Sequence, residues 1–447
     1  MICGAAKKKI TPGPGLLKNL NGLGNLQFSD VLDDIYVRVL LLGDDKQDRI
    51  LFVVFDLDKV PYPEKYLPAL SELTGIPETH ITLASIHTHT APIAGWRPTE
   101  GPNFILNKPE HVQNATHEYE AFLEQVVREA VAEAMACVQP VRIGWSHGES
   151  FVNINRLQDY FVRKDDGTVE VRVGLGQNPS VPVDRSLFVL KIEDMQGRPV
   201  ACLTNYAVHN CVMIGNHCGE HGGTLLSSDL GGNVSQMIEE NYPGCVALWT
   251  SGAAGDVNPI LSNEIFYPDP KTGKQTAYVL PAGEQAPCMM LKVLSARHYA
   301  DILTVLEHIT CTDTNMSLGS MVSWAYTPGK DSPYEIRVHL TRIGDLAFWG
   351  VSGELYSSIG RAIVQAMPNG IHHIINHDAS LMANTGYIFD DQTLMRDPDG
   401  TLPGRRNNGI LPGFAEKALL ELTSGMWQHT CQKSEENYEL SDQAEIE

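Results

Sequence analysis

Short apolar runs rich in β-branched residues recur along most of the chain, each bounded by turn residues. Runs of this length and composition are typical of β-strands. The predicted strands are Tyr36–Leu42, Ile50–Phe55, Ile81–Ile86, Val141–Trp145, Leu187–Ile192, Val200–Tyr206, Cys245–Trp249, Glu335–Leu340, Leu346–Val351 and Ile371–Ile375.

Helical periodicity is interleaved with these runs but is less regular. Apolar residues recur at helical spacing in Glu118–Cys137, and Leu230–Glu240 follows a Ser-Ser-Asp sequence that can cap a helix. Met289–His308 is a further long candidate, and Leu355–Met367 stops at a Pro-Asn-Gly sequence.

Strands and helices mix without strict alternation, which predicts an α/β (α+β) fold with mixed β-sheets packed together and flanked by helices. We expect a single domain over residues 1–431 and an acidic, flexible tail over residues 432–447. The segment Leu261–Ala286, rich in Pro, Gly and Lys, is predicted to form a lid or binding loop.

Charge and composition exclude several classes of protein. With 33 Lys and Arg against 54 Asp and Glu in 447 residues, the net charge of −21 argues against a nucleic-acid partner. No apolar run is long enough for a transmembrane segment, and Met1–Lys9 precedes no apolar signal region. Nine scattered cysteines without a CxxC pair indicate reduced thiols, so we expect a cytoplasmic protein; a secreted form with its signal removed is the alternative. The oligomeric state is not predicted.

Residues of the kinds that bind metals stand at the ends of predicted strands. His87 and His89 follow the run Ile81–Ile86, where the two-residue period of a strand would place them on one face. His209 follows Val200–Tyr206, and Glu354 follows Leu346–Val351. Two histidines and a glutamate with an open position form a common catalytic zinc arrangement. A His-x-His sequence alone is equally consistent with a polar strand end.

The sequence His217-Cys218-Gly219-Glu220-His221 matches the H-x-x-E-H pattern of inverted zinc peptidases. That pattern requires a helix, which the neighbouring glycines disfavour. We expect instead a flexible loop that brings His217 or His221 to the substrate.

Two other polar stretches are ambiguous by themselves. The loop Thr250–Pro259 is rich in glycine and could present backbone N–H groups to an oxyanion, or form an ordinary tight turn. Asn153–Arg156 could equally be a solvated loop.

Taken together and in order, these stretches resemble the catalytic domain of the neutral ceramidase family, zinc-dependent amidases that cleave the N-acyl bond of ceramide. The similarity covers most of residues 1–390. It is carried by Gly4–Pro12, the His-Thr-His stretch at 87–89, Asn153–Arg156, Ala207–His209, Leu226–Asp229, Gly255–Pro259, Gly353-Glu354 and Asn384–Ile388.

The resemblance implies a zinc ion held by His87, His209, Glu354 and Tyr387. The assignment of Tyr387 rests on the resemblance alone. It further implies that His89 lies beside the ion.

On the same grounds, Arg156 would face the substrate. We further expect His89 or Asp256 to lie near enough to the site to manage protons, and Asp229 to contribute to substrate binding.

The chain departs from the family at several points. Asn258 stands where the family has a serine after Gly-Asp-Val, and an amide cannot act as a nucleophile. His217 and His221 are additional histidines. We expect a short homologue without the family's C-terminal immunoglobulin-like domain and secretion signal.

These observations predict a zinc-dependent hydrolase of a small-molecule substrate, in which metal-activated water attacks an amide or ester-like bond. Hydrolysis of a lactone, an ester or a carbohydrate-derived polar substrate is an alternative. A non-catalytic binding protein with the same fold is another, suggested by Asn258.

Overall fold

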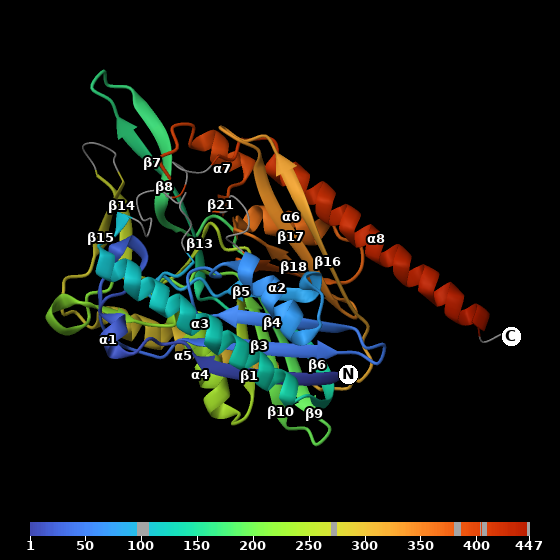
Figure 1. Cartoon of the computed structure of the whole chain (residues 1–447). Coiled ribbons are helices and arrows are strands. Elements are labelled where there is room, and N and C mark those ends of the chain that lie inside the picture. The colour runs from blue at the N-terminus through green and yellow to red at the C-terminus, as the bar shows by residue number, and fades with distance from the viewer. Residues whose placement is uncertain (96–106, 270–274, 380–385, 403, 405–408, 445–447) are drawn as a thin grey trace.

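The computed structural model describes residues 1–95, 107–269, 275–379, 386–402, 404 and 409–444. Its architecture is a mixed α/β arrangement of packed sheets with helices on their outer faces (Figure 1). This confirms the predicted fold class.

The largest sheet has eight strands, which lie in the order β12-β10-β9-β6-β1-β3-β4-β5. They are β1 (Ile2–Lys9), β3 (Tyr36–Gly43), β4 (Arg49–Phe55), β5 (Ile81–Ser85), β6 (Gln139–Glu149), β9 (Ser186–Asp194), β10 (Pro199–Tyr206) and β12 (Val246–Ser251). β1 and β6 pair only at Ile2↔Pro140 and Cys3↔Gln139, and β12 contacts β3, β4 and β5. The sheet therefore bends at β1 and β6, and its two halves share one core.

The second sheet has four strands in the order β16-β17-β18-β20. They are β16 (Leu318–Thr327), β17 (Tyr334–Ile343), β18 (Leu346–Val351) and β20 (Ile371–Asn376). Phe348 of this sheet packs in the same core as Phe52 and Phe188 of the first, with ring centroids 6.0 and 5.7 Å away. The two sheets are thus held together by apolar burial.

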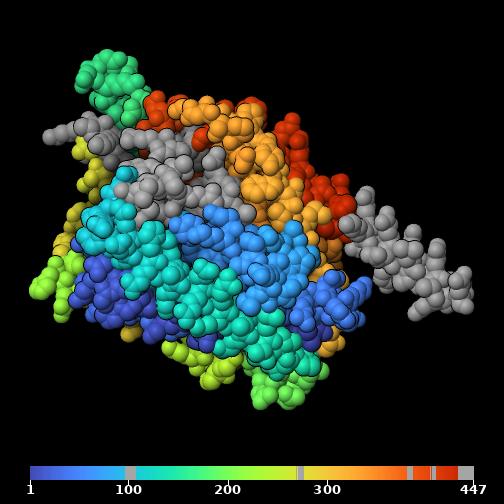
Figure 2. Space-filling view, viewed as in Figure 1, coloured from blue at the N-terminus to red at the C-terminus, as the bar shows by residue number. Residues whose placement is uncertain are grey.

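Smaller strand groups lie around these sheets. β13 (Val257–Pro259) pairs with β7 (Asn153–Arg163), which pairs with β8 (Val169–Asn178). The remaining pairs are β2 (Phe28–Val31) with β11 (Thr224–Leu226), β14 (Glu264–Pro268) with β15 (Gln275–Val279), and β19 (Glu354–Leu355) with β21 (Tyr387–Ile388). The β7–β8 hairpin projects from the body of the molecule (Figures 1 and 2).

The helices cover the outer faces of the sheets. They are α1 (Pro14–Leu17), α2 (Pro63–Thr74), α3 (Glu110–Ala136), α4 (Asp229–Asn241), α5 (Ala286–His308), α6 (Ser357–Ala366), α7 (Asp391–Arg396) and α8 (Ala415–Ala444). α2 and α3 pack over one face of β1, β3 and β4, and they form part of the blue and teal surface in Figure 2. α6 and α8 pack on the second sheet.

Each predicted strand and each predicted helix corresponds to an element of the same type, with shifts of a few residues at most ends and an earlier start at Glu110 for the helix predicted over Glu118–Cys137. Among the longer elements, the prediction missed β1, α2, the β7–β8 hairpin, β16 and α8. It also treated Leu261–Ala286 as a loop, although the segment contains the hairpin β14–β15. These elements have mixed or half-exposed faces, so their apolar pattern is weak.

The described residues include no helix long and apolar enough to cross a membrane. The cysteines whose side chains the structure describes form no disulfide among themselves. The backbone of α8 is helical as far as Ala444, within the predicted tail, and residues 445–447 lie outside the described residues. The division at residue 431 and the cytoplasmic location stay predictions.

Candidate metal centre

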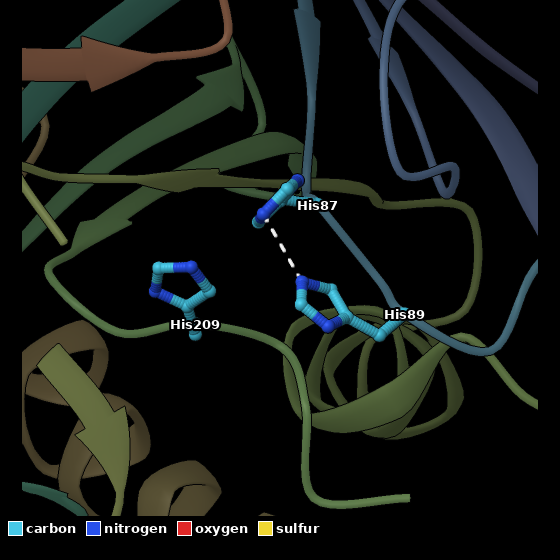
Figure 3. Close-up of side chains that lie close together, drawn as sticks. All are labelled: His87, His89 and His209. Carbon is cyan, nitrogen blue, oxygen red and sulfur yellow. Dashed lines mark hydrogen bonds between the residues drawn. The ribbon is translucent and has the colours of Figure 1, made fainter. Parts of the chain in front are cut away.

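His87 and His89 lie in the segment that follows β5, which ends at Ser85 and so before either histidine. His87 has a left-handed backbone with φ 63°. The predicted explanation by strand periodicity was therefore wrong, because the chain has already left the strand. The imidazoles meet through this turn instead: Nε2 of His89 lies 3.1 Å from Nε2 of His87 (Figure 3).

The turn is fixed by hydrogen bonds to distant parts of the chain. The backbone N–H of His89 donates to the carbonyl of Asn210 at 3.0 Å, and the hydroxyl of Thr88 donates to the carbonyl of Ser227 at 3.0 Å. The histidine turn is thereby tied to the chain that follows β10 and to the approach to α4.

His209 follows β10 and is anchored to β13. Its backbone N–H and its Nδ1 atom both lie 3.1 Å from the carbonyl oxygen of Val257. Since a carbonyl can only accept, Nδ1 carries the proton, and Nε2 presents a lone pair to the centre of the site. The ring nitrogens of His87, His89 and His209 offer ligand atoms within 4.8 Å of one another.

Glu354 completes the cluster from the second half of the chain. Its Oε2 atom lies 3.2 Å from Nε2 of His209 and 3.4 Å from Nε2 of His87. The parallel pair β19–β21 places Glu354 directly opposite Tyr387, and the Glu354 carboxylate helps to raise the pKa of the Tyr387 hydroxyl. The structure therefore brings together the four residues predicted as ligands, with His89 beside them.

Burial and charge shape the protonation of the cluster. Burial alone would lower the pKa of His87, but the carboxylates of Glu354 and Asp58 outweigh it and raise that pKa to about 10. Burial, helped by the positive charge of Arg156, lowers the pKa of His209 to about 4. Burial would raise the pKa of Glu354, yet the neighbouring imidazoles hold it well below its usual range.

The cluster fits a divalent cation. Without a metal ion, a proton on His87 supplies the positive charge that balances the carboxylates of Glu354 and Asp58. A divalent cation would supply this charge instead, because metal ions displace protons from ligands of this kind. The ring atom Nδ1 of His89 is buried without a hydrogen-bond partner among the described residues. Imidazole nitrogens with one carboxylate are a donor set typical of zinc.

Two residues that the sequence analysis missed surround His87. Its Nδ1 atom lies 2.8 Å from the backbone carbonyl of Asp58 and 3.1 Å from Oδ1 of the same residue. The ring of His377 stacks on that of His87 at 3.9 Å between centroids and an interplanar angle of 17°. Both residues follow predicted strands, so the rule that singled out His209 and Glu354 would also have found them.

Arg156 and Asn258 lie together at one side of the cluster. The guanidinium carbon of Arg156 lies 5.1 Å from the centroid of the Tyr387 ring, and its Nη1 donates to Oδ1 of Asn258 at 3.2 Å. Asn258 directly follows Val257, which anchors His209. The predicted position of Arg156 near the reaction centre is compatible with this placement.

Asp256 has a different environment from the one expected of a proton-transfer residue. Its carboxylate accepts hydrogen bonds from the amide of Asn155 at 2.7 Å and from the backbone N–H and hydroxyl of Ser357 at 2.7 and 2.9 Å. These bonds join β7 to the start of α6. We therefore assign Asp256 a positioning role in place of the predicted catalytic one.

The residues predicted to bind substrate in the loop after His209 do not join the cluster. The carboxylate of Asp229 is fully buried and accepts hydrogen bonds from the backbone N–H groups of Val212, Met213 and Leu230. These bonds connect the loop that follows His209 to the start of α4, so Asp229 has a structural role.

His217 Nδ1 donates to the carbonyl of Gly222, and His221 lies exposed in the short 3-10 turn Glu220–Gly222. A turn of this kind excludes the helical peptidase geometry, as predicted.

The fold and the site define a mixed α/β protein with a buried histidine and carboxylate centre at the ends of its strands. None of the known family models matches the chain. Neutral ceramidase B of Dictyostelium discoideum is 29% identical over 191 residues, which is 41% of this chain and 24% of that protein. Neutral ceramidase A of the same organism is 24% identical over 270 residues, 55% of this chain and 34% of that protein. The matched regions thus span 24% and 34% of the length of these relatives.

Two solved structures share the fold. The neutral ceramidase from Pseudomonas aeruginosa superposes with a TM-score of 0.62 at 15% identity, covering 88% of this chain and 69% of that one. A ceramidase complexed with C2 gives a TM-score of 0.69 at 14% identity, covering 97% of this chain and 75% of that one. The chain therefore has the fold of the neutral ceramidase catalytic domain, and the resemblance seen in its sequence is confirmed. Within the motif Asn384–Ile388, which contributes to this resemblance, Asn384 and Thr385 lie outside the described residues.

Proposed function

We propose that this protein is a zinc-dependent hydrolase of an amide or ester-like bond, similar in its chemistry to the ceramidases. The observation that carries the proposal is the convergence of His87, His209 and Glu354, from three distant parts of the chain, on one buried point. The relatives named above, which are called ceramidases, support the reaction class.

His87, His209, Glu354 and Tyr387 would hold the ion. Zinc bound there would lower the pKa of a bound water towards 7 and polarise a carbonyl group. The chain supplies the geometry, because the carbonyls of Asp58 and Val257 fix which ring nitrogen of His87 and His209 faces the centre.

His89 would handle the proton. Burial lowers the pKa of His89 from its usual value, so the ring is neutral and has an unprotonated nitrogen that can accept a proton. Its Nε2 lies 3.1 Å from Nε2 of His87, within reach of anything bound at the centre.

Asn258 restricts the mechanism. The family serine is absent at this position, and an amide side chain can position a substrate or a water molecule but cannot form an acyl intermediate. We therefore propose direct attack by water, without a covalent acyl-enzyme.

The test is metal analysis of the purified protein, followed by hydrolysis assays after chelation and after zinc is restored. We expect about one zinc per chain and activity that follows zinc occupancy. Assays on an amide, an ester, a lactone and a sugar ester identify the bond. A protein without stoichiometric metal, inactive on all four, would be the non-catalytic binding protein instead.

A further inference from the structure

Apolar side chains are exposed on one face of the β7–β8 hairpin, which projects from the body of the molecule (Figure 1). Phe161 of β7 is 72% exposed, and Val169 and Val171 of β8 are 54% and 56% exposed. Phe161 and Val171 are direct cross-strand partners, and Val169 lies two residues from Val171, so these side chains share one face. Exposed apolar side chains gathered in this way are characteristic of a contact surface.

β8 is also the outer strand of its sheet. The strand order is β13-β7-β8, so one edge of β8 has no paired strand among the elements that the structure describes. The hairpin turn fixes which backbone groups face that edge. The N–H of Lys164 donates to the carbonyl of Thr168 at 2.9 Å, which makes these two residues a hydrogen-bonded pair of the ladder.

The backbone groups at the outer edge of β8 belong to its odd-numbered residues. Hydrogen-bonded and non-hydrogen-bonded pairs alternate along an antiparallel ladder, and the register next to the turn is regular through the pair Arg163↔Val169. The even-numbered residues of β8 therefore bond to β7. The N–H and C=O groups of Val169, Val171 and Val173 face the outer edge, where they can pair with another strand.

This edge is complementary to a second copy of itself. When two copies of β8 pair antiparallel with Val171 opposite Val171, Val169 of each copy lies opposite Val173 of the other. Every one of these residues directs its N–H and C=O to the new partner, so each pair exchanges both of its hydrogen bonds. The backbone phase of β8 thus permits a pairing centred on Val171.

The charges of β8 match in the same register. Glu170 of each copy lies opposite Arg172 of the other, in a non-hydrogen-bonded pair, where facing side chains are closest. Opposite charges directly across two strands stabilise their pairing. Within one chain, Oε1 of Glu170 already lies 3.2 Å from Nε of Arg172, so the paired strands would carry an alternating row of charges.

Neighbouring registers lose this match. Pairings of the same backbone phase can also be centred on Val169 or on Val173. They would place Glu170 opposite Thr168 or opposite Gly176, neither of which carries a charge. Charge complementarity therefore selects the register about Val171.

A lipid bilayer is a poorer partner for this hairpin. The turn at its tip carries Lys164, Asp165 and Asp166, and charged side chains are costly to place in hydrocarbon. The apolar face lies behind that charged turn. The observations therefore favour a second copy of this chain over a membrane surface.

We propose that β8 is a dimerisation edge, at which two copies of this protein pair antiparallel about Val171 to form one continuous sheet. Phe161 of each copy would flank the central valines on the same face. The inference is independent of the proposed hydrolase function. One strand pair is a small interface compared with the roughly 1,200–2,000 Å² of stable complexes, so the dimer should be weak and dependent on concentration.

The test is sedimentation equilibrium of the full chain from about 1 μM to about 1 mM, in about 0.15 M salt to screen the repulsion between chains of net charge −21. The average mass should rise from that of one chain towards that of two. Val171→Pro removes the central outward N–H without removing a hydrogen bond to β7, and it should abolish this rise. Val171→Thr, which keeps the N–H and the branched shape, is the matched control and should dimerise.

A charge exchange tests the register. Glu170→Arg and Arg172→Glu each place like charges opposite one another, so each variant alone should be monomeric. An equimolar mixture of the two variants restores opposite charges across the strands and should dimerise again. This arm also decides the question if Val171→Pro does not fold, which circular dichroism of each variant reports.

Several results would overturn the proposal. They are a wild type that stays monomeric at about 1 mM, a dimer that persists in folded Val171→Pro, and folded charge variants that do not associate when mixed. A monomer that binds phosphatidylcholine vesicles, and loses this binding in Phe161→Ser, would assign the apolar face to a lipid surface instead.

Discussion

His87 and Asp58 form a histidine and carboxylate pair at the metal centre. Nδ1 of His87 donates to the backbone carbonyl of Asp58 at 2.8 Å and lies 3.1 Å from its carboxylate oxygen Oδ1. Burial would raise the pKa of Asp58, but the charge of His87 outweighs it, so the carboxylate stays ionised. Such a partner fixes the orientation of the imidazole and increases its basicity as a ligand.

We therefore predict that Asp58→Asn weakens zinc binding by about 10- to 100-fold, the usual effect of removing such a partner. The backbone carbonyl remains, so the fold and the tautomer of His87 should be kept. A competition titration with a chromophoric chelator measures the affinity. Asp48→Asn, at an exposed position, should bind zinc as the wild type does; equal affinity in both variants would show that Asp58 has no role in the site.

The ligands themselves should be indispensable. His209→Ala and Glu354→Ala each remove one donor from a set of four, so we expect each to lose bound zinc and hydrolytic activity while keeping a wild-type circular dichroism spectrum. Metal content after gel filtration is the measurement. His117→Ala removes an exposed histidine from α3 and serves as the control. Full zinc occupancy in His209→Ala or Glu354→Ala is incompatible with the assigned ligands.

Asn258 should act by hydrogen bonding and not as a nucleophile. The wild-type protein should hydrolyse its substrate without a covalent adduct, and Asn258→Ser should change substrate preference without being needed for turnover. Single-turnover hydrolysis in oxygen-18 water, with mass spectrometry of the intact protein, checks both statements. An acyl adduct on any side chain, or activity confined to the serine variant, would show a covalent mechanism.

The buried carboxylate of Asp378 should make stability depend on pH. Burial would raise its pKa, but the charges and hydrogen bonds of Arg337 and His339 hold it below the usual range. A lowered folded-state pKa contributes stability above the ordinary value of about 4, and this contribution is lost as the pH falls through the folded-state pKa. The free energy of unfolding of the wild type should therefore decrease in acid.

Asp378→Asn should remove part of that acid dependence and cost about 3–5 kcal/mol at pH 7, because Arg337 is left buried without an opposite charge. Urea denaturation at a series of pH values measures both effects. Asp345→Asn, at an exposed turn, is the control and should change little. An Asp378→Asn protein as stable as the wild type would mean that the ion pair contributes nothing.

Much of the fold and the core of the site followed from local pattern. Strands such as Ile50–Phe55 are continuous apolar runs between turn residues, and that pattern is set by burial on both faces. His209 and Glu354 were found because polar residues that follow buried strands lie at sheet ends, where sites are commonly formed. Tyr387 could not be found this way, since an aromatic residue at a strand end is ordinary, and it entered only through the family resemblance.

What the sequence by itself determined about this protein was the mixed α/β class, the positions of most strands, and His87, His209 and Glu354 as candidate ligands. The tertiary structure alone decided that Asp58 is the partner of His87. It also decided that the carboxylates of Asp229 and Asp256 accept hydrogen bonds from neighbouring parts of the chain and so stabilise the fold. The reason is physical: periodicity reports which side of an element is buried, whereas the chemical role of a polar side chain depends on the few atoms within hydrogen-bond distance, and these come from chain segments far apart in sequence.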